Sequence, residues 1–159
     1  MRWYLDLDGV MADFEGAYHR LFGHWAKEAT KGQLWDNVNS VSHFYRDLEP
    51  MPGAIEFFEE IEYLNPTILT AGSPGDLFYQ CAMDKKWWVR NHLSKNVTFI
   101  CCVGGQNKPV FMHAPGDVLI DDFGRNIECW EKEGGIAIKH QGDFQETRRQ
   151  VELLLNRKR

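Results

Sequence analysis

Short apolar segments alternate with longer segments of helical periodicity, and this alternation constrains the fold more than any other feature. The short segments predict strands at 3–7, 67–70, 97–103, 118–120 and 136–138. Apolar residues at three- and four-residue spacing predict helices at about 14–25, 54–64, 77–93, 125–133 and 144–155. Strands that alternate with helices form a mostly parallel sheet covered on both faces. We therefore predict an α/β fold, a Rossmann-like three-layer α/β/α arrangement around a mostly parallel five-stranded sheet.

Length and charge narrow the classes of function. The chain has 159 residues, which suggests one domain with room for a small insert. Its formal net charge of −5 argues against long nucleic acid as a partner, although a metal ion could still attract a mononucleotide. The first residues, MRWYLDLDG, do not resemble a signal peptide, and no apolar run of 18 residues exists, so no membrane is expected. The four cysteines form no C-x-x-C pair, so we expect reduced thiols and a cytoplasmic location.

Carboxylates follow two of the predicted strands. Asp6 and Asp8 come at the end of the first strand, and Asp121 and Asp122 follow the fourth. The carboxyl ends of parallel strands meet at one edge of the sheet, where ligands bind. Carboxylates gathered there repel one another unless a cation such as Mg²⁺ lies between them. Ordinary turn and helix-capping aspartates are the alternative interpretation of each pair.

Two further segments carry groups that can hold a phosphate. Thr70 ends the second predicted strand, and Ala71 and Gly72 continue into a loop whose hydroxyl and N–H groups could bind phosphate oxygens, with Ser73 as a second candidate. Lys108 follows a glycine-containing loop and could neutralise a phosphoryl oxygen. The alternatives are ordinary turn chemistry for Thr70 and an exposed, solubilising side chain for Lys108.

These residues together resemble the four motifs of the haloacid dehalogenase-like (HAD) superfamily. Asp6-Leu7-Asp8-Gly9-Val10 is similar to the first motif, Thr70 to the second, Lys108 to the third and Asp121-Asp122 to the fourth. Within the superfamily, the chain resembles the 5'(3')-deoxyribonucleotidases most, through segments that cover nearly its whole length. These segments are DLDGVMADFE (6–15), DLEPMPGA (47–54), Asp84-Lys85 with Trp88-Val89, and LIDD (119–122).

The resemblance implies a Mg²⁺-dependent phosphatase for (deoxy)nucleoside monophosphates. Asp6 would be the nucleophile that forms an aspartyl-phosphate, and Asp8 the general acid and base. The Asp6 carboxylate, the Asp8 backbone carbonyl and one or both of Asp121 and Asp122 would bind Mg²⁺. Thr70, Ala71, Gly72 and Lys108 would hold the phosphate.

The resemblance also implies a small helical cap over 15–47, shorter than is usual in the family, within a single domain over 1–159. Phe14 and Trp35 would contact the nucleobase, although core packing is the alternative for both. A homodimer is compatible with the resemblance, but no feature of the sequence decides it. Two other functions stay open: a HAD phosphatase for another small metabolite or a nucleic-acid terminal phosphate, and a non-catalytic nucleotide- or protein-binding module.

Overall fold

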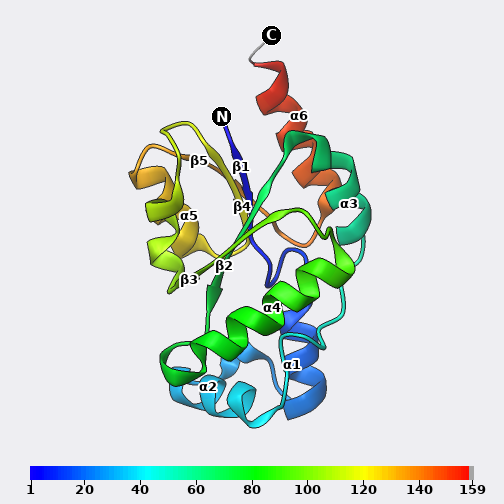
Figure 1. Cartoon of the computed structure of the whole chain (residues 1–159), viewed down its shortest axis with the longest axis vertical. Coiled ribbons are helices and arrows are strands. Elements are labelled where there is room, and N and C mark those ends of the chain that lie inside the picture. The colour runs from blue at the N-terminus through cyan, green and yellow to red at the C-terminus, as the bar shows by residue number, and fades with distance from the viewer. Residues whose placement is uncertain (158–159) are drawn as a thin grey trace.

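The computed structural model describes residues 1–157 and contains one five-stranded parallel sheet (Figure 1). The strand order is β3-β2-β1-β4-β5. The strands are β1 (Trp3–Leu5), β2 (Thr67–Gly72), β3 (Thr98–Val103), β4 (Val118–Asp121) and β5 (Ile136–Lys139). The predicted α/β fold and its five strands are thus confirmed.

Helices cover both faces of the sheet, as the apolar strands require. One face packs against α3 (Ala54–Ile61), α4 (Phe78–His92) and α6 (Phe144–Asn156), and the other against α5 (Gly124–Lys132) and the 3₁₀ helix Gly105–Phe111 (Figure 1). Successive strand residues alternate between the two faces: Leu5 belongs to the first core, and Tyr4 to the second. No helix within residues 1–157 is long and apolar enough to cross a membrane.

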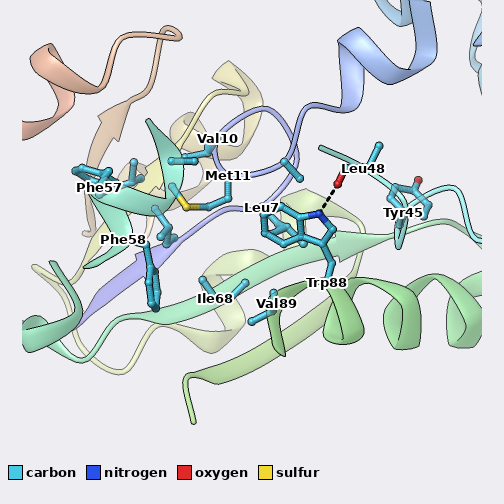
Figure 2. Packing of buried hydrophobic residues seen from close by; sticks show 14 of the residues in the cluster. Leu7, Val10, Met11, Tyr45, Leu48, Phe57, Phe58, Ile68, Trp88 and Val89 are labelled. Atoms are coloured by element: carbon cyan, nitrogen blue, oxygen red, sulfur yellow. Dashed lines mark hydrogen bonds between the residues drawn. The ribbon is translucent and has the colours of Figure 1, made fainter. Parts of the chain in front are cut away.

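The larger core centres on α4 and the segment that leads into α3. The Trp88 side chain is fully buried, and Figure 2 shows its indole ring beside Leu7. Its indole N–H donates a hydrogen bond of 2.7 Å to the Leu48 carbonyl, drawn as the dashed line in Figure 2. A buried indole N–H needs such a partner, so Trp88 ties α4 to the chain that returns from the region of α1 and α2.

The region between β1 and α3 contains α1 (Phe14–Phe22), a 3₁₀ helix (Ala26–Glu28) and α2 (Lys31–Ser40). These elements lie at the lower end of Figure 1, beside the first turns of α4. The predicted helix at 14–25 ends earlier, because Gly23 adopts a left-handed conformation (φ +77°) and its N–H bonds to the His19 carbonyl. Helix α2 was not predicted, since 27–47 has no clear hydrophobic period, but Thr30 caps it at the Gln33 N–H.

Two strand boundaries differ from the prediction and matter for function. Strand β1 ends at Leu5 rather than at residue 7, because the chain turns sharply after Asp6. Strand β2 continues to Gly72 rather than ending at Thr70, because it pairs with β3 as far as Gly72 and Val103. Since β1 lies between β2 and β4, their carboxyl ends bring three distant segments to one place.

Candidate active site

Asp6 lies at the centre of this edge, directly after β1. Its backbone N–H continues the pairing with β4 through a 2.9 Å bond to the Ile120 carbonyl. Its Oδ1 lies 2.7 Å from Lys108 Nζ, which also lies 2.6 Å from Asp121 Oδ2. Lys108 is fully buried, so the exposed, solubilising interpretation was wrong. A buried lysine between two carboxylates neutralises part of their charge and fixes their orientation.

The chain after Asp6 forms a tight turn that leaves room for Asp122. The Leu7 carbonyl accepts hydrogen bonds from the N–H groups of Val10, Met11 and Ala12 at 3.3, 2.8 and 2.9 Å. Gly9 has φ +78°, and a Cβ there would lie 2.2 Å from an Asp122 carboxylate oxygen. Only glycine allows both this backbone conformation and this close approach.

Lys85 on α4 is a functional candidate that the sequence reasoning missed. Its Nζ donates to Asp8 Oδ2 at 2.5 Å, to Thr70 Oγ1 at 3.1 Å and to the Ala71 carbonyl at 2.5 Å. The ammonium also lies 4.5 Å from the centre of the Tyr45 ring. One signal was available: Lys85 falls on the same helical face as the buried Cys81 and Trp88, where a lysine is unexpected.

Asp6, Asp121 and Asp122 form a set of carboxylates suited to a cation. One oxygen from each lies within 4.8 Å of the other two. Asp121 already accepts hydrogen bonds from the Phe123 N–H and the Asn126 amide, in addition to Lys108. Asp122, in contrast, has no hydrogen bond or ion pair from its carboxylate to another residue in 1–157. This oxygen set fits a hard divalent cation, and Asp122 is the freer of the two aspartates to bind it.

The charges of this edge shift the pKa values of its carboxyl groups. Burial and the nearby Asp6 carboxylate raise the pKa of Asp121 to about 6, although Lys108 opposes the shift. Burial, Asp6 and Asp121 raise the pKa of Asp122 to about 8. Burial also raises the pKa of Asp8, against the lowering effect of Lys85. A bound cation would offset the repulsion between carboxylates that adds to the effect of burial, which is the second reason to place one here.

Asn126, on α5, is another residue that the sequence reasoning missed. Its Nδ2 lies 3.1 Å from Asp121 Oδ2 and 3.3 Å from Oδ1, and the side chain lies beside the loop at Gly105. It therefore helps to fix the orientation of the Asp121 carboxylate. Its place in the first turn after the Asp121-Asp122 pair was the only hint that the sequence offered.

These groups lie at one wall of a cavity of about 750 Å³. Asp6, Asp8, Lys108 and Asp122 line it, as do Thr70, Ala71 and Gly72 at the end of β2. Phe14 and Trp35 line it from the region of α1 and α2. Ser73, the second phosphate candidate, lines a neighbouring cavity instead, and its hydroxyl lies 3.1 Å from the Tyr45 hydroxyl.

Two buried polar atoms of this cavity lack a partner among the described residues. They are Asp8 Oδ1 and the indole nitrogen of Trp35. Buried polar atoms are normally hydrogen-bonded, so an unpaired acceptor and an unpaired donor at a cavity wall point to a polar ligand. Phe14 has a mixed environment, because it packs against Tyr18 and Phe44 while also lining the cavity.

Known proteins with similar sequences identify the family of this chain. Residues 22–148 match the family described as "5' nucleotidase, deoxy (Pyrimidine), cytosolic type C protein". A putative 5'(3')-deoxyribonucleotidase of Bordetella bronchiseptica is 32% identical over 74% of this chain and 72% of its own. The human cytosolic-type 5'(3')-deoxyribonucleotidase is 32% identical over 77% of this chain and 70% of its own.

Solved structures agree on the fold. A HAD-superfamily hydrolase from Ehrlichia chaffeensis aligns over 97% of both chains with a TM-score of 0.55, at 11% identity. A hydrolase from Pseudomonas syringae aligns over 93% of this chain with a TM-score of 0.53. The sequence relatives show that the chain belongs to the 5'(3')-deoxyribonucleotidase family, and its fold is the one found in HAD-superfamily hydrolases.

Proposed function

We propose that this protein is a Mg²⁺-dependent phosphatase that hydrolyses (deoxy)nucleoside monophosphates through an aspartyl-phosphate on Asp6. One observation carries the proposal: a single cavity contains both the Asp6 carboxylate beside buried Lys108 and the aromatic side chains of Phe14 and Trp35. The first pair suits phosphoryl transfer, and the second suits a nucleobase. The relatives that carry the name 5'(3')-deoxyribonucleotidase support the same substrate class.

In the first half-reaction, an Asp6 oxygen attacks phosphorus and the bond from phosphorus to the ester oxygen breaks. Asp8, protonated at the start, gives its proton to the leaving ester oxygen. The raised pKa of Asp8 favours this protonated form, and its unpaired Oδ1 is the free atom of the carboxyl group. In the second half-reaction, Asp8 takes a proton from water as the water attacks phosphorus, and Asp6 is released with inorganic phosphate.

Positive charge reduces the repulsion between the Asp6 carboxylate and the anionic substrate. Lys108 and Lys85 supply two such charges, and both lysines have raised pKa values because nearby carboxylates outweigh the effect of burial. Asp6, Asp122 and the Asp8 carbonyl would hold Mg²⁺, with Asp121 beside them. When bound, the ion would supply further charge neutralisation and orient the phosphoryl group.

Residues 15–47 serve as a small cap in this proposal, within one domain that spans the chain. The cap contributes Trp35, whose unpaired indole N–H could donate to a base carbonyl while the ring of Phe14 packs on the base. Thr70, Ala71 and Gly72 line the same cavity, and the phosphate would lie beside them. We place the enzyme in the cytoplasm, since all four cysteines are free thiols.

Phosphate release from a panel of nucleotides tests the proposal. The panel contains 5'- and 3'-deoxynucleoside monophosphates, the matching ribonucleotides and sugar phosphates, each with Mg²⁺ and with a chelator. We expect Mg²⁺-dependent turnover with a preference for nucleotides. Turnover of sugar phosphates alone would leave the mechanism in place and remove the nucleotide assignment. Absence of turnover with every substrate would favour a binding protein.

A further inference from the structure

The lining of the cavity includes three exposed cations that the proposed chemistry does not use. Lys27, Lys31 and Arg125 line the same cavity as Asp6, and all three are exposed. None of them forms an ion pair or a side-chain hydrogen bond with any residue in 1–157. The lysines beside the carboxylates differ, because Lys85 and Lys108 are buried and already paired.

The three cations approach from different elements. Lys27 lies in the 3₁₀ helix Ala26–Glu28, Lys31 is the first residue of α2, and Arg125 lies in the first turn of α5. The cap and the core domain therefore both contribute positive charge to the lining. Glu15 is the one acidic residue among the cap residues of the lining, and its Oε2 already accepts the Ala26 N–H at 3.0 Å.

A nucleoside monophosphate would leave these cations without a partner. Its phosphate must reach Asp6, and its base would occupy the wall of Phe14 and Trp35. The remaining lining is cationic in a chain whose net charge is −5, so this local excess opposes the overall charge. The volume of about 750 Å³ is in the upper part of the range of ligand pockets, so the cavity has room for a second charged group.

We infer that the preferred substrate carries a second phosphate group, which Lys27, Lys31 and Arg125 bind while the first phosphate is hydrolysed at Asp6. The inference rests on the proposed function and specifies its substrate class. Two sources share this chemistry: a nucleoside 3',5'-bisphosphate, and a 5'-phosphorylated dinucleotide, whose internal phosphodiester would be the second charge. We call Lys27, Lys31 and Arg125 the rim cations. A lysine ammonium binds a phosphate as a point charge, and an arginine guanidinium can bind it through two parallel hydrogen bonds.

Steady-state kinetics with matched substrates test the inference. We compare three substrates: a deoxynucleoside 5'-monophosphate, its 3',5'-bisphosphate and the 5'-phosphorylated dinucleotide. Each is tested with the wild type, with the single variants Lys27→Gln, Lys31→Gln and Arg125→Gln, and with the variant that combines all three substitutions. Lys95→Gln is the control, because Lys95 is exposed and precedes β3 at the opposite end of the sheet. It removes the same charge at a distance from the cavity.

We expect kcat/KM for at least one doubly charged substrate to exceed that of the monophosphate by roughly tenfold, mainly through KM. Each rim variant should reduce this advantage by about twofold to fivefold, the range for exposed ionic contacts, and the triple variant should abolish it. Monophosphate turnover and Lys95→Gln should change by less than about twofold. The better of the two doubly charged substrates identifies the source of the second phosphate.

Equal kcat/KM for all three substrates, or an equal loss for all of them in the rim variants, would overturn the inference while leaving the proposed function intact. Binding to Asp6→Asn, measured by calorimetry with the same three compounds, separates recognition from turnover. Preferential binding of a doubly charged compound that the triple variant loses would support the binding of a second phosphate by these cations, and absence of phosphate release would then count against the proposed function alone. Equal binding of all three compounds would contradict it.

Discussion

The Lys85 ammonium lies 2.5 Å from Asp8 Oδ2, although the two residues are 77 positions apart in the sequence. The same ammonium reaches Thr70 Oγ1 at 3.1 Å, so one buried side chain of α4 joins the loop after β1 to the end of β2. This contact orients the proposed general acid. The Lys85 ammonium is also one of the two buried positive charges next to the proposed phosphate position.

Replacing Lys85 should reduce turnover more than it reduces binding. Lys85→Met keeps most of the buried hydrocarbon but removes the charge that orients Asp8, so we expect kcat to fall by about 10- to 100-fold. The pH profile of kcat should change as well, because Asp8 loses its neighbouring cation. Lys86→Met is the matched control, since Lys86 is exposed and should leave kcat unchanged. Equal kcat in both variants would contradict the role of Lys85.

Mg²⁺ should stabilise the protein more at alkaline than at acidic pH. The pKa values of Asp121 and Asp122, about 6 and about 8, exceed the ordinary value of 3.8. A carboxyl with a raised pKa stabilises the metal-free fold fully below its ordinary value, and this stability is lost as pH rises through the raised value. The metal-free protein should therefore lose stability between about pH 4 and pH 8, where the carboxylates become charged and repel one another.

Thermal unfolding with and without Mg²⁺ checks this expectation. The increase in Tm on adding the ion should be larger near pH 8 than near pH 5, because the ion offsets the repulsion only when the carboxylates are ionised. Asp122→Asn should remove most of the Mg²⁺ effect. An increase in Tm that is independent of pH, or larger in acid, would exclude these carboxylates as the metal site.

Gly9→Ala should disturb the site through Asp122. The new Cβ would lie 2.2 Å from an Asp122 carboxylate oxygen, at a backbone φ of +78° that alanine disfavours. We expect a loss of about 1–3 kcal/mol in the free energy of unfolding, together with weaker Mg²⁺ binding. Gly32→Ala is the control, because Gly32 lies in α2 with nothing within 4 Å of the new Cβ. That substitution should stabilise the protein by about 0.5–1 kcal/mol. Denaturant titration compares the two, and equal effects would contradict the account.

Trp88→Phe should destabilise the fold without altering the site directly. It removes the 2.7 Å hydrogen bond to the Leu48 carbonyl and leaves that buried acceptor unpaired. The expected loss is about 1–3 kcal/mol in the free energy of unfolding. The neighbouring Trp87 is 48% exposed, so Trp87→Phe should change stability by less than about 0.5 kcal/mol. A small effect of Trp88→Phe, similar to that of Trp87→Phe, would show that the hydrogen bond contributes little.

The sequence predicted the sheet well because its strands are continuous apolar runs bounded by turn residues. It also predicted that Asp6, Asp8, Asp121 and Asp122 gather at one edge, because parallel strands deliver their carboxyl ends there. The structure brings together the carboxylates of Asp6, Asp121 and Asp122, whereas the Asp8 carboxylate pairs with Lys85 instead. Helix α2 escaped prediction because tertiary packing and the Thr30 cap, rather than a hydrophobic period, define it.

Lys85 and Asn126 escaped prediction for a different physical reason. Both residues lie on the buried faces of helices, and their partners, Asp8 and Asp121, lie on other elements. A helical pattern indicates which face is buried, but it does not indicate what a polar residue on that face will meet. The same reason explains Lys108: sequence favoured an exposed lysine for the isolated residue, and only the fold places it between two carboxylates.

Acid quenching during turnover tests the central claim, that Asp6 forms a covalent bond to phosphorus, most directly. The enzyme is mixed with substrate and Mg²⁺, stopped in acid within a turnover, and examined by mass spectrometry of the intact chain and of the peptide that contains Asp6. The account predicts one added phosphoryl group on Asp6, lost on treatment with hydroxylamine and missing in Asp6→Asn, whose turnover should fall by roughly 10³-fold or more. An unmodified Asp6 under conditions of full turnover, or a phosphoryl group on another residue, would contradict it.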